Sequence, residues 1–72
     1  MSFAERTLPE WTEFMRELIQ REGRAVQAGR DNTIEVQSFN TGEWHTINLT
    51  NGKPFFTTTA ERDTALARIQ TP

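Results

Sequence analysis

The stretch from residue 33 to residue 57 decides the fold, and it reads TIEVQSFNTGEWHTINLTNGKPFFT. Apolar and polar residues alternate from Thr33 to Phe39 and again from Glu43 to Thr50, as they do in strands that bury one face. Asn51-Gly52 is the preferred dipeptide of a type I′ hairpin turn. The stretch therefore predicts an antiparallel meander with strands at about 33–39, 43–50 and 54–57.

The expected register keeps the two faces of this meander chemically distinct. A tight turn at Thr41-Gly42 places Val36 opposite Ile47, Ile34 opposite Leu49 and Phe39 opposite Trp44. The hairpin at Asn51-Gly52 places Phe56 opposite Ile47. Side chains alternate along a strand, so one face is then apolar. The other face carries the polar residues Thr33, Glu35, Gln37, Thr46, Asn48 and Thr50, together with the Phe39–Trp44 pair.

A helix precedes the meander. Thr7-Leu8-Pro9-Glu10 reads as a capping box, with Thr7 as N-cap and a proline in the first turn, where its missing N–H is harmless. Apolar residues then follow at helical spacing, and Gly23 is a natural residue for ending the helix. The stripe consists of Trp11, Phe14, Met15, Leu18 and Ile19. We predict a helix over residues 8–22.

The remaining segments complete the architecture. Residues 24–28 form a short candidate strand, and Thr58-Thr59-Ala60-Glu61 offers a second capping box for a helix over about 59–69. That helix has a thin apolar face of Ala65, Leu66 and Ile69. The sequence therefore predicts one small α+β domain over residues 1–72, ordered α-β-β-β-β-α. Its antiparallel meander sheet is covered on one face by the two helices.

Composition excludes several classes of function. The 72 residues include no cysteine, so disulfide frameworks, thiolate zinc sites and thiol catalysis are excluded. The formal net charge of −2 gives no support to nucleic-acid binding. No apolar run is long enough to cross a bilayer, and the N-terminus lacks the pattern of a signal peptide. We expect a cytoplasmic protein with no membrane partner.

The residues for catalysis are also few. His45 is the only histidine, and it lacks the neighbours that a metal site or a nucleophilic triad needs. Glu10, Glu13 and Glu17 lie on the polar face of the first helix, where carboxylates are ordinarily solvated. The expectation is a protein that is not an enzyme, with no catalytic residues, no metal and no cofactor.

The distribution of aromatic residues is the most informative functional feature. Phe39, Trp44 and Phe55 are expected on the outer face of the sheet, away from the helices. Two interpretations stay open. The aromatics stabilise the hairpin as a cross-strand pair, or they form an exposed patch that binds a partner protein, flanked by Arg24 and Arg30.

The second interpretation leads to a hypothesis of function. The chain would be a small non-enzymatic protein-binding module, acting on another protein or protein complex as a regulator, an inhibitor or an assembly subunit. Its size is typical of phage and mobile-element accessory proteins. The alternative is a sheet-based nucleic-acid-binding protein, whose aromatics stack on bases beside Arg24, Arg30 and Lys53. A homodimer is slightly favoured over a monomer, because the strand that contains Pro54 leaves a sheet edge free.

Overall fold

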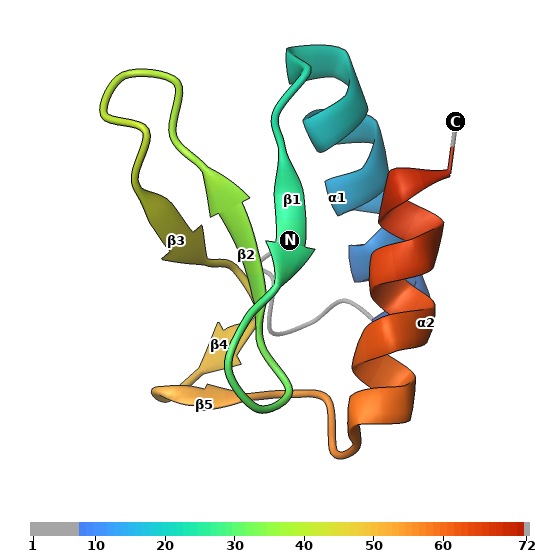
Figure 1. The fold of residues 1–72 in the computed structure, drawn as a ribbon. Helices are drawn as coiled ribbons and strands as arrows, with labels where there is room; N and C mark the ends of the chain where they lie inside the picture. The colour runs from blue at the N-terminus through green and yellow to red at the C-terminus, as the bar shows by residue number, and fades with distance from the viewer. Residues whose placement is uncertain (1–7, 72) are drawn as a thin grey trace.

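A computed structural model describes residues 8–71, in which two helices lie on one side of a three-stranded antiparallel sheet (Figure 1). The sheet has the order β1-β2-β3, and β4 and β5 form a separate two-stranded hairpin. The elements are α1 (Leu8–Glu22), β1 (Val26–Ala28), β2 (Ile34–Gln37), β3 (Trp44–Thr46), β4 (Leu49–Thr50), β5 (Lys53–Pro54) and α2 (Thr59–Gln70). The predicted α+β class is confirmed, with helices packed on an antiparallel sheet.

Helix α1 has the predicted bounds. Gly23 follows it with a φ of 68°, a left-handed conformation that glycine adopts without steric cost. The Gly23 N–H donates to the carbonyl of Gln20 at 3.3 Å and the Arg24 N–H to that of Ile19 at 3.1 Å. This pair of bonds is a Schellman motif, which satisfies carbonyls that the helix end leaves open. The predicted N-cap, Thr7, lies outside the described residues.

Helix α2 begins directly after Thr58, the first residue of the predicted capping box. The hydroxyl of Thr58 accepts a hydrogen bond from the Glu61 N–H at 3.1 Å. The carboxylate of Glu61 accepts from the hydroxyl of Thr57 at 2.6 Å, so it reaches one residue further back than the capping-box pattern predicts. The helix then buries Ala65 and Ile69 against the sheet, together with the side chain of Arg62.

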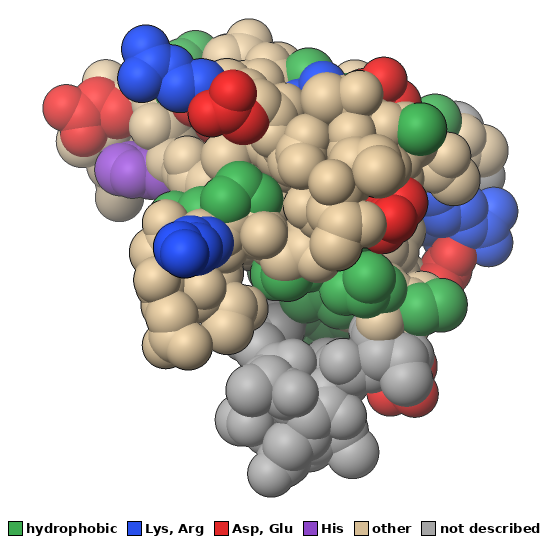
Figure 2. Space-filling model, turned by 90° about the horizontal axis from the view of Figure 1, so that it is seen from below, with side chains coloured by type: hydrophobic (Ala, Val, Ile, Leu, Met, Phe, Trp, Pro, Cys, Tyr) green, Lys and Arg blue, Asp and Glu red, His purple; other side chains and the backbone are tan. Residues whose placement is uncertain are grey.

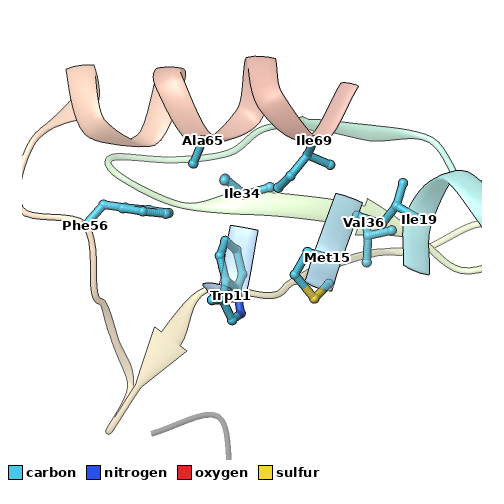
Figure 3. Packing of buried hydrophobic residues seen from close by; sticks show 8 residues of the cluster. All are labelled: Trp11, Met15, Ile19, Ile34, Val36, Phe56, Ala65 and Ile69. Atoms are coloured by element: carbon cyan, nitrogen blue, oxygen red, sulfur yellow. The ribbon is translucent and has the colours of Figure 1, made fainter. Parts of the chain in front are cut away.

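The core lies between the helices and the inner face of the sheet, and both helices contribute to it (Figure 3). Ile34 of β2 and Ile69 of α2 are fully buried and lie next to each other in this view. Burying an aliphatic side chain of this size contributes about 1.5–3 kcal/mol. The buried apolar residues are Trp11, Met15, Ile19, Ile34, Val36, Phe56, Ala65 and Ile69.

The last hairpin has the predicted register. Leu49 pairs with Pro54 and Thr50 with Lys53. Asn51 and Gly52 have φ values of 54° and 78°, the two positive angles that a type I′ turn requires. This register carries the chain to Phe56, which is buried as predicted.

The middle hairpin differs from the prediction by two residues. Val36 pairs with His45 instead of Ile47, and the Ser38 N–H donates to the Glu43 carbonyl at 2.8 Å. The turn is therefore a four-residue loop over 39–42, not a two-residue turn at Thr41-Gly42. A two-residue type I′ turn needs positive φ at both residues, and a β-branched threonine resists that angle. Because the shift is two residues, Val36 and Ile47 still share the inner face.

The predicted long strand over 43–50 is divided into β3 and β4. Asn48, expected on the polar outer face, is completely buried, and Leu49, expected on the apolar face, is 46% exposed. The division follows from the side chain of Asn48, which bonds to the backbone of Ile34 and Asn32 at 2.8 Å each. The chain turns at Asn48. The alternation of side chains along the predicted strand 43–50 therefore does not tell which face Asn48 and the residues after it occupy.

The other strands are shorter than predicted. They cover 26–28, 34–37 and 53–54, where the sequence predicted 24–28, 33–39 and 54–57. Neither helix within residues 8–71 has the length and apolar character that crossing a membrane requires.

Candidate functional site

The three aromatic residues predicted to form one outer patch lie in three different places. Phe55 is half-buried against the core, where its ring meets that of Trp11 edge-on at 4.8 Å between centroids. Its ring is also 4.9 Å from that of Phe56. The predicted outer position of Phe55 is wrong because its backbone N–H bonds to the carbonyl of Asn48 at 3.1 Å, so Phe55 lies beside Asn48, which is itself buried.

Phe39 lies in the β2–β3 loop and is 62% exposed. The guanidinium carbon of Arg24 is 5.2 Å from the centre of its ring, within the range of a cation–π contact. Arg24 also lies 3.4 Å from a carboxylate oxygen of Glu22. Phe39 therefore packs on the chain that leaves α1, and it is not paired with Trp44.

Trp44 keeps the position that the sequence predicts. It is 37% exposed and pairs with Gln37, so it lies on the outer face of the sheet, opposite to the face of Val36. Arg30, which was predicted to flank it, lies in the β1–β2 turn and is exposed. Arg24 precedes β1 and Arg30 follows it, so the two cations are at opposite ends of that strand and do not frame one patch.

Four of the six arginines within residues 8–71 lie close to a carboxylate of the domain. Arg68 of α2 forms an ion pair with Glu13 of α1, which lies 3.7 Å from Arg16. Figure 2 shows basic and acidic side chains interspersed over the face that it views, with no continuous basic stripe there. This distribution does not favour the nucleic-acid alternative. Within residues 8–71, no group of three or more His, Asp or Glu side chains could hold a metal ion.

Two buried polar side chains have roles that sequence reasoning missed. The side chain of Asn48 accepts a hydrogen bond from the backbone N–H of Ile34 in β2. The side chain of Arg62 bonds to the β1–β2 turn. The Nη1 atom of Arg62 lies 2.9–3.2 Å from the carbonyl oxygens of Gly29, Asp31 and Thr33. Its Nε donates to Asp63 at 2.7 Å. The position of Arg62 one turn before Ala65 predicts that its stem packs on the thin apolar face of α2, but not that its guanidinium bonds to the β1–β2 turn.

Among the described residues 8–71, no strand pairs with the outer edge of β3, and this open edge is the most distinctive surface of the sheet. The Ile47 N–H donates to the Ile34 carbonyl at 3.0 Å, and the Ser38–Glu43 bond lies at the other end of the same ladder. Hydrogen-bonded and non-bonded pairs alternate in antiparallel sheets, so His45 bonds to Val36 between these two points. The backbone groups of Trp44 and Thr46 consequently point away from β2, toward the open edge.

The opposite edge of the sheet differs because α2 lies beside it. The side-chain amide of Gln70 donates to the carbonyl of Val26 at 3.4 Å. In Figure 1, β3 is the strand of this sheet farthest from α2. The outward carbonyl of Val26 in β1 is therefore bonded to the domain's own helix, whereas no residue within 8–71 bonds to the outward backbone groups of β3.

A hollow of about 300 Å³ lies between α1 and the inner face of β2, next to this open edge. Its lining is apolar apart from Glu22 and Arg24; the residues are Met15, Leu18, Ile19, Glu22, Arg24, Val36 and Ile47. Ile47 directly follows β3, so a strand added beside β3 would direct alternate side chains toward this hollow.

A larger apolar hollow, of about 580 Å³, lies between the first turns of α1 and the side of α2 that carries Ala65. Figure 2 views the molecule from below and shows apolar side chains on that face. This hollow is bordered by helices and has no strand edge, so it lacks the alternating backbone donors and acceptors that the β3 edge offers to an extended segment. The site at β3 combines both kinds of interaction and is the stronger candidate.

Comparison of the chain with protein-family models, with curated proteins and with solved structures finds no match.

Proposed function

We propose that this domain is a protein-binding module that pairs an extended segment of a partner protein with the free edge of β3. The observation that carries the proposal is the outward orientation of the backbone groups of Trp44 and Thr46, next to an apolar hollow. Main-chain hydrogen bonds to an edge strand provide affinity, and pockets for alternate side chains provide specificity. The edge of β3 offers the hydrogen bonds, and the hollow between α1 and β2 offers a pocket for side chains.

The residues of β3 support this use. Trp44, His45 and Thr46 are all exposed, and none is a lysine or a proline, the residues that commonly protect sheet edges. The exposed ring of Trp44 provides the large apolar contact that is typical of interface anchors. Of the residues first expected to bind a partner, the proposal retains Trp44. It also includes Arg24, which lines the hollow and contacts the ring of Phe39, and it does not use Phe55 or Arg30.

The test is selection of binding peptides with two matched proline variants. Thr46→Pro removes an N–H that points to the open edge and leaves the β2–β3 bonds in place. Ala28→Pro removes an N–H of the same kind at the other edge, since the chain bonds to β2 through Ala25 and Gly29. Proline is tolerated on edge strands where the N–H faces away from the neighbouring strand.

Peptides selected from a random display library on the wild type should bind Ala28→Pro with unchanged affinity and Thr46→Pro at least tenfold more weakly. Thermal unfolding of both variants confirms that they fold. Peptides that bind all three proteins equally would place the binding surface elsewhere and overturn the proposal.

A further inference from the structure

The hollow beside the β3 edge indicates the chemistry of the segment that pairs there. We infer that this segment carries one large apolar side chain that enters the hollow, between two residues whose side chains lie on the other face of the sheet. The inference rests on the proposed function, because it names the class of partner for the same edge. It adds a requirement on the partner's sequence, which main-chain hydrogen bonds alone do not impose.

The backbone of β3 decides which partner side chain faces the hollow. Trp44 and Thr46 present their N–H and C=O groups to the open edge, and their side chains lie on the outer face of the sheet. Residues that lie level with each other on neighbouring strands point their side chains to the same face. His45 pairs with the buried Val36, so the partner residue level with His45 points to the inner face, toward the helices.

The inner face has room for this side chain because it is covered at β2 and open at β3. Val36 is buried, whereas His45, which shares its face, is exposed. The wall of the hollow includes Leu18 of α1 and Ile47, which directly follows β3. Neighbouring strands are about 4.8 Å apart, so a partner side chain has to extend over β3 to reach this wall. A leucine, methionine or phenylalanine side chain is long enough, and an alanine side chain is not.

The lining of the hollow selects an apolar side chain over a charged one. Its two charged residues, Glu22 and Arg24, have opposite signs and lie 3.4 Å apart, so the wall has no unmatched formal charge to attract an ion. A charged side chain would lose its hydration there without gaining an opposite charge. A large apolar side chain instead removes its own surface and that of Leu18 and Ile47 from water.

The partner residues directly before and after this anchor are not under the same requirement. They lie beside Trp44 and Thr46 on the outer face, where the neighbouring side chains of β2 are the polar Glu35 and Gln37. A polar side chain at these two positions keeps its contact with water. The inference therefore predicts a preference for a large apolar residue at one position and tolerance at the positions beside it.

Substitutions along a selected peptide test this prediction on the unaltered domain. The peptides are those selected on the wild type that Thr46→Pro binds at least tenfold more weakly. Each peptide residue is replaced in turn by alanine and by aspartate, and the affinity is measured by isothermal titration calorimetry. Replacing one large apolar residue by alanine should weaken binding at least about tenfold, and by aspartate further. The same replacements at the two adjacent positions should change the affinity less than about threefold.

Leu18→Gln tests whether the anchor enters the hollow, because it places an amide in the wall. It should weaken binding of the same peptide at least about tenfold. Leu66→Gln is the matched control, since Leu66 is also a partly buried leucine that packs on the core from a helix, but it does not line this hollow. Thermal unfolding compares the stability of the two variants. In the complex with the wild type, nuclear Overhauser effects should connect the anchor side chain to Leu18 and Ile47.

Three results would overturn the inference: peptides that tolerate aspartate at every position, equal binding by Leu18→Gln and Leu66→Gln, or an anchor whose nuclear Overhauser effects reach only Trp44 on the outer face. The peptide substitutions and the Overhauser effects use the wild type, so they decide the question even if Leu18→Gln does not fold. The proposed function survives each of these results, because the peptides still depend on Thr46. If no selected peptide depends on Thr46, both fail.

Discussion

The side chain of Asn48 takes the place of a backbone partner for Ile34. Its Oδ1 accepts the Ile34 N–H at 2.8 Å, where regular pairing would use the carbonyl of Ile47. Its Nδ2 donates to the carbonyl of Asn32 at 2.8 Å. One buried amide thus ends the β2–β3 ladder, turns the chain toward β4 and limits β3 to a short strand with an open edge.

Asn48→Ala should destabilise the domain strongly. The substitution leaves the Ile34 N–H and the Asn32 carbonyl without these partners, and each unsatisfied buried group costs about 1–3 kcal/mol. We expect a loss of at least about 2 kcal/mol in the free energy of unfolding, measured by urea denaturation. Asn40→Ala, in the exposed β2–β3 loop, is the control and should change it by less than about 0.5 kcal/mol. Similar values for the two variants would contradict the role of Asn48.

Arg62→Met should weaken the β1–β2 turn. Methionine preserves much of the buried stem but cannot donate to the carbonyls of Gly29, Asp31 and Thr33. Hydrogen bonds to charged groups contribute about 1.5–3 kcal/mol, so we expect a loss of that size in the free energy of unfolding. Arg30→Met changes an exposed arginine in the same turn and should be nearly neutral. Equal stability of Arg62→Met and the wild type would show that these contacts are dispensable.

Thr58→Ala should shorten or loosen α2 at its start. The hydroxyl that caps the Glu61 N–H is lost, which costs about 0.5–2 kcal/mol at an N-cap. Thr59→Ala, one residue further on, retains the cap and provides the control. Thermal denaturation, followed by circular dichroism, compares the stability of the two variants. A larger loss of stability for Thr59→Ala would show that Thr59, and not Thr58, caps the helix.

Glu13→Gln should have only a small effect on stability. Glu13 does contact Arg68 of α2, so it is not simply a solvated residue on the polar face of α1. Both side chains are about half exposed, however, and exposed ion pairs contribute less than about 1 kcal/mol. The difference from the wild type should also decrease as salt is added. A larger loss that salt does not change would indicate a role other than this ion pair.

The sequence predicts the elements with strong local signals and fails where a single side chain redirects the backbone. Asn51-Gly52 specifies its turn because both residues accept positive φ, while Thr41-Gly42 does not, so the middle loop is longer. The register of β2 and β3 differs from the prediction by two residues, so the predicted faces of the β2 side chains are still correct. Alternation alone could not reveal that Asn48 is buried as a backbone substitute, and Leu49 and Phe55 were consequently assigned to the wrong surroundings.

The candidate site was only partly predictable for the same reason. Trp44 lies on the outer face because the face of a strand depends on parity, which the shift preserves. The open edge of β3 depends on which strand lies outermost and on where α2 packs, and these are tertiary features. The contacts of Arg62 and the hollow beside Leu18 likewise arise only when distant segments meet.

Hydrogen exchange at the backbone amides of Trp44 and Thr46 tests the central claim, that partners pair with the β3 edge, most directly. In dilute free protein these two amides should exchange rapidly, while those of His45 and Ile47, which bond to β2, are protected. When a peptide selected on the wild type is bound, the amides of Trp44 and Thr46 should become at least about tenfold slower. Unchanged rapid exchange at both positions in the saturated complex would contradict the account.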